Sequence, residues 1–150
     1  MKAILIIDHG STLPAANHML ECVGDLVQAM AGPDVVVRVA HMELAEPTIA
    51  QGFDACVAAG AGEVVAFPYM LSPGKHSTRD IPRLVAQAAA SHPGVRYSVT
   101  PAFGVHDHLA SVILERAGVS ATHRADDGCA CVRPAGAPER WCGEACRELA

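Results

Sequence analysis

Four apolar runs alternate with segments of helical periodicity, and this alternation constrains the fold more than any other feature of the chain. The runs cover residues 2–8, 35–42, 63–70 and 95–100. The first three are apolar at consecutive positions, which is typical of strands buried on both faces of a sheet. Helical patterns occupy 14–31, 47–59, 80–91 and 107–117. The sequence therefore predicts an α/β fold with a doubly wound, mainly parallel four-stranded sheet.

Single residues sharpen these boundaries. Pro47 is expected in the first turn of the second helix. Pro68 is expected to end pairing in the third strand, and Asp80 to cap the third helix. Cys56 falls on a helix stripe and is predicted to lie in the core. The helix at 14–31 is expected to bury one stripe, made of Met19, Cys22, Val23, Leu26, Val27 and Met30.

Size and charge exclude several classes of protein. At 150 residues the chain is long enough for one domain with its own core. The net charge of −5 argues against non-specific binding to nucleic acid or to an anionic membrane. No apolar run reaches the roughly 20 residues that cross a bilayer. The N-terminus opens on a strand-like segment rather than a signal peptide, so we expect a cytoplasmic protein.

The last part of the chain has a different character. We expect an α/β domain over 1–118 and a Cys-rich tail over 119–150. In a reducing compartment, cysteines serve as thiols or metal ligands rather than in disulfides. Four thiols can hold zinc or an iron–sulfur cluster. The alternatives are a redox pair and incidental thiols in a disordered tail. The cysteines concerned are Cys129, Cys131, Cys142 and Cys146.

Three chemically active side chains follow the first three apolar runs: His9, Glu43 and His76. The carboxyl ends of parallel strands meet at one edge of a sheet, where open α/β sheets bind ligands. Two imidazoles and a carboxylate suit a metal-handling site. The alternative for His9 is a surface histidine in a turn. Glu46 is explained by its place near a helix N-terminus, which makes Glu43 the better candidate.

A basic cluster surrounds His76. Lys75, Arg79 and Arg83 suit an anionic ligand, because local rather than net charge sets local attraction. The alternative is a solvated basic loop. The His-x-His at 106–108 has ligand spacing, but a helix start explains it better. His41 is expected to be a core or interface histidine.

The common nucleotide and acyl-transfer signatures are absent. The sequence has no G-x-G-x-x-G, no G-x-x-x-x-G-K-[ST] and no G-x-S-x-G. A dinucleotide-binding fold and a nucleophile elbow are therefore not indicated. The lack of a P-loop predicts an activity that does not use ATP.

Taken together, the motifs resemble a family. They are IDHGS (7–11), MELAEPTI (42–49), VVAFPYMLSPGKHSTRDIP (64–82) and AFGVHDHL (102–109). In this order and spacing they resemble the short-form sirohydrochlorin chelatases, the small cobalt- or iron-inserting enzymes of cobalamin and siroheme biosynthesis. The resemblance covers residues 1–118. It implies a chelatase-like α/β lobe that inserts Co²⁺ or Fe²⁺ into sirohydrochlorin.

The resemblance also implies roles for single residues. His9 and His76 match the metal-binding histidines of the family, and Glu43 matches its active-site acid. Metal insertion releases two pyrrole protons, and imidazole, with an ordinary pKa of about 6.5, can accept them at neutral pH. Thr12 departs from the pattern, since many relatives carry arginine after the HGS.

The substrate and partners follow from the same resemblance. The carboxylates of the macrocycle are expected to meet Lys75, Arg79 and Arg83, with Ser11 as a further contact. A single lobe offers a shallow cleft, so a homodimer is expected to enclose the macrocycle. Some chelatases of this type carry iron–sulfur clusters. Two other functions remain open: a non-enzymatic carrier of metal or tetrapyrrole, and an iron–sulfur sensor.

Overall fold

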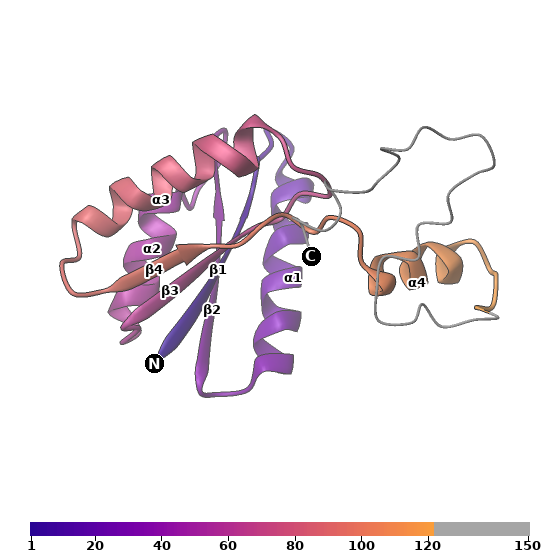
Figure 1. Ribbon diagram of the computed structural model, residues 1–150, viewed down its shortest axis with the longest axis horizontal. Coiled ribbons are helices and arrows are strands. Elements are labelled where there is room, and N and C mark those ends of the chain that lie inside the picture. Colours follow the sequence, from indigo (N-terminus) through magenta and orange to yellow (C-terminus); the bar gives the residue numbers. More distant parts are fainter. Residues whose placement is uncertain (122–150) are drawn as a thin grey trace, which may run out of the picture. The chain divides into compact units, whose positions relative to one another are not determined.

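A four-stranded parallel sheet forms the centre of the region Met1–Ala102 (Figure 1). The structure is a computed structural model, and it describes residues 1–121. The strands lie in the order β2-β1-β3-β4, and every neighbouring pair is parallel. This confirms the predicted fold class. The strands are β1 (Lys2–Asp8), β2 (Val35–His41), β3 (Glu63–Pro68) and β4 (Arg96–Val99).

Helices cover both faces of the sheet. The helix α1 (Pro14–Ala31) packs on one face, and α2 (Ile49–Ala58) and α3 (Ile81–Ala90) pack side by side on the other (Figure 1). Leu5 and Ile7 of β1 join the larger core under α2 and α3, whereas Ile6 joins the smaller core under α1. Because successive side chains point to opposite faces, a strand covered on both must be apolar throughout.

The second helix begins two residues later than the sequence analysis predicted. It starts at Ile49 rather than at Pro47, because Thr48 and Gln51 form a capping box. The Thr48 hydroxyl accepts the N–H of Gln51, and the Gln51 side chain accepts the N–H of Thr48. The pair satisfies two backbone donors that a helix start would leave unpaired. The Thr-x-x-Gln spacing was the signal for this start. The end of β3 at Pro68 agrees with the prediction.

The expectation that Asp80 caps the third helix is wrong. Asp80 has helical backbone angles and makes no capping hydrogen bond, because a π-helical turn, η1 (His76–Asp80), leads straight into α3. The N–H of Ile81 donates to the carbonyl of His76, five residues earlier. Turns of this kind are frequent at functional sites, and this one begins at a predicted site residue.

The stripe that α1 was expected to bury is wrong in part. Leu20 and Gly24 are buried and Val23 and Val27 pack with them, but Cys22 is exposed. Two helices, α2 and α3, cover the larger core on one face of the sheet. On the other face α1 packs on β2 over the smaller core. A single helix can bury only part of a broad apolar surface. Three further apolar residues of the predicted stripe are at least 61% exposed, namely Met19, Leu26 and Met30.

The chain divides into two units. The first is Met1–Ala102, and the second begins at Phe103 and contains α4 (Asp107–Arg116). The predicted boundary at 118 between an α/β domain and a Cys-rich tail stays a prediction. Within residues 1–121, no helix is both long enough and apolar enough to cross a membrane.

The two cysteines of the first unit are predicted to differ sharply in reactivity. Cys56 is fully buried, and burial raises the pKa of its thiol from 9.0 to about 11, although Arg38 opposes the shift. At pH 8 the thiolate fraction of Cys56 is then about 100-fold lower than that of a thiol with a pKa of 9.0, since each pKa unit is a factor of ten. Iodoacetamide followed by peptide mapping should label Cys22 at least that much faster than Cys56. Equal rates in the native protein would contradict the burial, and equal rates in urea are the control.

Candidate functional site

Backbone pairing between β1 and β2 continues beyond both strands. The N–H of Met42 donates to the carbonyl of Asp8 over 2.9 Å, and the N–H of Glu43 donates to the carbonyl of His9 over 3.1 Å. Side chains that follow paired strands in register are held at the same edge. His9 and Glu43 therefore come to lie side by side at the carboxyl edge of the sheet.

Gly10 permits the close approach of these two segments. Its φ is +84°, in the region that L side chains rarely adopt. A Cβ atom at this position would lie 1.9 Å from the backbone oxygen of Glu43. The turn after β1 can therefore follow this path only with glycine at position 10.

His9 and Glu43 form an ion pair at this edge. Nε2 of His9 lies 2.8 Å from Oε1 of Glu43, and the two side chains are 43% and 53% exposed. Nδ1 of His9 lies 3.2 Å from the carbonyl oxygen of Gly10. Both ring nitrogens of His9 thus lie within hydrogen-bonding distance of an oxygen atom.

His76 joins this pair from the first residue of η1. Its ring meets that of His9 edge to face, with the centroids 5.1 Å apart and the planes at 71°. Nδ1–H of His76 donates to Oδ2 of Asp80 over 3.1 Å. A carboxylate on one ring nitrogen orients the imidazole and leaves Nε2 as the nitrogen with a free lone pair.

Asp80 is held in its charged form. The Arg79 guanidinium donates to Oδ1 of Asp80 over 2.9 Å, and His76 donates to its other oxygen. These contacts, Arg79 first, lower the pKa of Asp80 below its ordinary value, although partial desolvation opposes them. Asp80 is therefore ionised at neutral pH, and its carboxylate can accept the hydrogen bond from Nδ1–H of His76.

The predicted metal ligands gather but do not form a ready-made cage. His9, Glu43 and His76 all lie at one edge, as the sequence indicated. Within residues 1–121, however, no three His, Cys, Asp or Glu side chains already stand in an arrangement that could hold a metal ion.

The three basic residues that were predicted to bind an anionic ligand are exposed to solvent near His76. Lys75, Arg79 and Arg83 recur every four residues along η1 and the start of α3, and all three are exposed. Arg83 contacts Gln87 over 3.3 Å. The Ser11 hydroxyl accepts the N–H of Leu13 over 3.0 Å, which fixes the turn before α1. Ser11 therefore has a structural task beside any contact with a substrate.

Several supporting residues escaped the sequence analysis. Asp8 and His41 form a buried hydrogen bond beneath the site, and only the strand register brings them together. The partnership of Asp80 with His76 had a local signal, because residues four apart on a helix are neighbours. His106 caps α4 by accepting the N–H of His108, so in the second unit this His-x-His is a helix start. The four tail cysteines lie outside the described residues, and their role as ligands stays a prediction.

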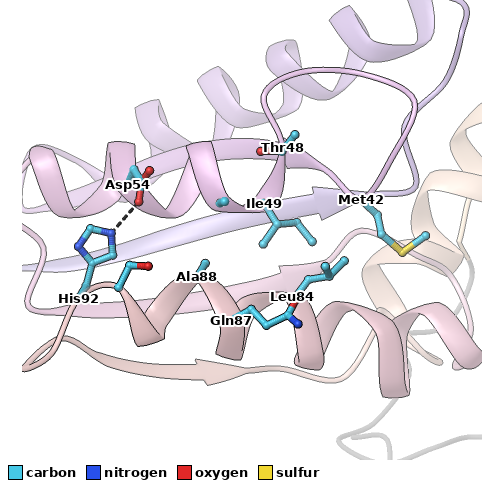
Figure 2. A pocket seen from close by; sticks show the side chains of 10 residues that line it. Met42, Thr48, Ile49, Asp54, Leu84, Gln87, Ala88 and His92 are labelled. Atoms are coloured by element: carbon cyan, nitrogen blue, oxygen red, sulfur yellow. Dashed lines mark hydrogen bonds and ion pairs between the residues drawn. The ribbon is translucent and has the colours of Figure 1, made fainter.

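A separate groove of about 640 Å³ lies between α2 and α3 (Figure 2). Its floor includes Ile49 and Leu84, and His92 and Asp54 pair at one end over 2.6 Å. No lysine or arginine lines the groove, which does not suit a ligand rich in carboxylates. The groove contains none of the three gathered side chains. Its lining consists of Met42, Thr48, Ile49, Ala50, Asp54, Leu84, Gln87, Ala88, Ser91 and His92.

Comparison with known proteins gives consistent matches. The model of the CbiX family matches residues 3–119. A chloroplastic sirohydrochlorin ferrochelatase from Arabidopsis thaliana is 40% identical over 89% of this chain and 59% of its own length. A sirohydrochlorin cobaltochelatase from Priestia megaterium is 31% identical over 77% of this chain and 37% of its own length. This chain therefore spans less than two thirds of either relative.

A solved structure agrees with these matches. It is the crystal structure of the sirohydrochlorin chelatase SirB from Bacillus subtilis subspecies spizizenii in complex with cobalt. It is 31% identical and superposes with a TM-score of 0.72, covering 78% of this chain and 50% of that one.

Replacing Gly10 by alanine is predicted to disrupt the site. The Gly94→Ala variant is a matched control, because Gly94 also has a positive φ but has open space around it. The backbone change alone costs roughly 1–2 kcal/mol. The overlap with Glu43 at position 10 should add about 1–3 kcal/mol. Urea unfolding of the two variants measures the difference, and equal losses of stability would contradict the close approach at Gly10.

Proposed function

Because this chain belongs to the CbiX family, we propose that it inserts Co²⁺ or Fe²⁺ into sirohydrochlorin in a reaction that needs no ATP. Relatives named as cobaltochelatases and as ferrochelatases support both metals. Each ion is a substrate of this reaction rather than a resident cofactor. The absence of P-loop and dinucleotide motifs in the sequence is consistent with an activity driven by metal binding alone.

The observation that carries the proposal is the gathering of His9, Glu43 and His76 at the carboxyl edge of the sheet. Imidazole nitrogen and carboxylate oxygen both bind first-row divalent ions. The three side chains are 43–53% exposed, so a macrocycle can approach them. A site that must release its ion to a substrate benefits from ligands that are close together but not locked into a cage.

The same atoms can account for the protons. Insertion forms metal–nitrogen bonds to the macrocycle and releases two pyrrole protons for each divalent ion. As the ion leaves the protein, the ligand atoms of His9, Glu43 and His76 regain lone pairs that can accept those protons. Metal and proton would then exchange at one place, which keeps the charge of the site nearly constant.

The exposed cations suit the rest of the substrate. Sirohydrochlorin carries many carboxylates, and guanidinium and ammonium groups bind carboxylates through charge-assisted hydrogen bonds. Lys75 directly precedes His76, and Arg79 and Arg83 follow it on η1 and α3. A macrocycle held by these cations would have its centre near the two imidazoles.

Loss of either imidazole is predicted to abolish most of the turnover. The His9→Ala and His76→Ala variants should each lower the rate of metal insertion by about 100-fold or more, because a ligand and a proton acceptor are both lost. Purified protein, sirohydrochlorin and Co²⁺ or Fe²⁺ are mixed anaerobically, and the absorbance spectrum is followed over several turnovers. Glu43→Gln should also lower the rate, by a smaller factor.

His18→Ala is the control for this experiment. His18 is 72% exposed and contacts Glu21 and Cys22 of its own helix, so the variant should retain the activity of the unmodified protein. His92 is a poorer control, since it stacks on Phe53 and pairs with Asp54. A protein that binds metal and macrocycle stoichiometrically without repeated turnover would be a carrier instead. Full activity in His76→Ala would contradict the assigned site.

A homodimer is the expected working form. One lobe exposes about half of each gathered side chain, and a second copy facing it would shield the macrocycle from solvent. Sedimentation velocity at micromolar concentration, with and without sirohydrochlorin, should give the mass of two chains. A single-chain mass under both conditions would contradict this expectation.

A further inference from the structure

A buried polar pair lies directly beneath the proposed site. Asp8 and His41 end β1 and β2, and they are partners in the sheet register. Nδ1–H of His41 donates to Oδ1 of Asp8 over 2.6 Å. His41 is fully buried, and the Asp8 side chain is 22% exposed. No step of the proposed chemistry uses either residue.

His41 leaves a polar atom unsatisfied. A carboxylate can only accept, so Nδ1 carries the proton and Nε2 presents a lone pair. In the described part of the chain, Nε2 of His41 is the buried side-chain nitrogen or oxygen that has no hydrogen-bond partner. An apolar side chain of similar volume would fill this space without that cost. The pair must therefore do something that packing alone does not.

One oxygen atom connects the pair to the site. Oδ1 of Asp8 accepts from His41 and also accepts the backbone N–H of Gly10 over 2.9 Å. The second bond closes an Asx-turn around His9. In that turn Gly10 lies close to the backbone carbonyl of Glu43, with no room for a side chain. A single carboxylate thus joins the end of β2, through His41, to the turn that carries His9.

We propose that Asp8 and His41 are positioning residues, which hold the turn at His9 against Glu43 and so set the spacing of these two side chains. The inference rests on the proposed function for its effect on turnover. The spacing itself also governs binding of a divalent ion in the absence of the macrocycle. Partners that orient metal ligands typically contribute 10–100-fold to metal affinity or activity.

Two substitutions at His41 separate positioning from stability. His41→Leu keeps the volume and removes the unsatisfied nitrogen, and because Asp8 is 22% exposed, water can replace the lost donor, so the variant should be about as stable as the unmodified protein. His41→Asn restores an N–H donor near the position of Nδ1 but leaves a cavity, so it should be less stable. Positioning predicts the opposite order for function. Co²⁺ affinity and insertion rate should fall about tenfold or more in His41→Leu and be largely rescued in His41→Asn.

Asp8 gives a second test that does not depend on the core. Asp8→Ala loses both hydrogen bonds of the shared oxygen, whereas Asp8→Asn keeps an acceptor for both. We expect Asp8→Ala to lose Co²⁺ affinity about tenfold or more and Asp8→Asn to stay within about threefold of the unmodified protein. Because Asp8 is partly exposed, the two variants test the proposal even where a change at His41 prevents folding.

The chain supplies a matched control pair. His92 and Asp54 are also 2.6 Å apart, but they link α2 to the end of α3, away from the carboxyl edge (Figure 2). His92→Leu and Asp54→Ala should change the unfolding midpoint without changing Co²⁺ affinity. The measurements are isothermal titration with Co²⁺ alone, the insertion assay and urea unfolding, all on the full chain.

The outcomes distinguish the two proposals. If the unmodified protein binds Co²⁺ but shows no insertion, the proposed function fails and the titration arm still tests the positioning. If His41→Leu and Asp8→Ala bind Co²⁺ as tightly as the unmodified protein, the positioning role is overturned. It is also overturned if function in the four variants simply follows their stability.

Discussion

The site depends on two backbone hydrogen bonds that extend the pairing of β1 and β2 past the last residue of each strand. They join Asp8 to Met42 and His9 to Glu43. In a parallel sheet the bonds are evenly spaced, so the register set deep in the core fixes the position of everything that follows. The apolar contacts of Leu5 and Ile7 therefore determine, through the register, which side chains meet at the edge. Gly10 allows that register to continue where any other residue would force the segments apart.

The fold and the three gathered side chains were predictable because both depend on patterns along the chain. Continuous apolar runs identify strands covered on both faces, and parallel strands bring their following residues to one edge. The comparisons confirm the family to which the motifs pointed. The errors fall where contacts between distant residues decide. Cys22 was placed in the core because periodicity does not reveal how much sheet a helix will find to cover. Asp80 was taken for a cap because the π-helical turn before it has no clear sequence signal.

If the proposed function holds, the three gathered side chains must balance binding of the ion against its release. A closed cage of three or four ligands would hold a divalent ion tightly and give it up slowly. Here His9 is paired with Glu43, and His76 stands beside them with its other nitrogen fixed by Asp80. Under the proposed function, an entering ion would bind between side chains that already contact one another, and the macrocycle would displace these protein ligands to take the ion. Such an arrangement would favour exchange at the expense of affinity, which suits an ion that is substrate rather than cofactor.

Six histidines of the described chain contact a carboxylate, yet these contacts serve different tasks. The difference lies in burial and in what the second ring nitrogen faces. At His76 the carboxylate of Asp80 fixes Nδ1, and Nε2 is the nitrogen that would bind the ion under the proposed function. At His41 the second nitrogen is buried without a partner, so the residue can orient its neighbours but cannot reach a substrate. At His92 the ring lies on Phe53, and the pair ties two helices together. These histidines cannot be told apart in the sequence. Their different burial and partners follow from the strand register and the packing of the helices.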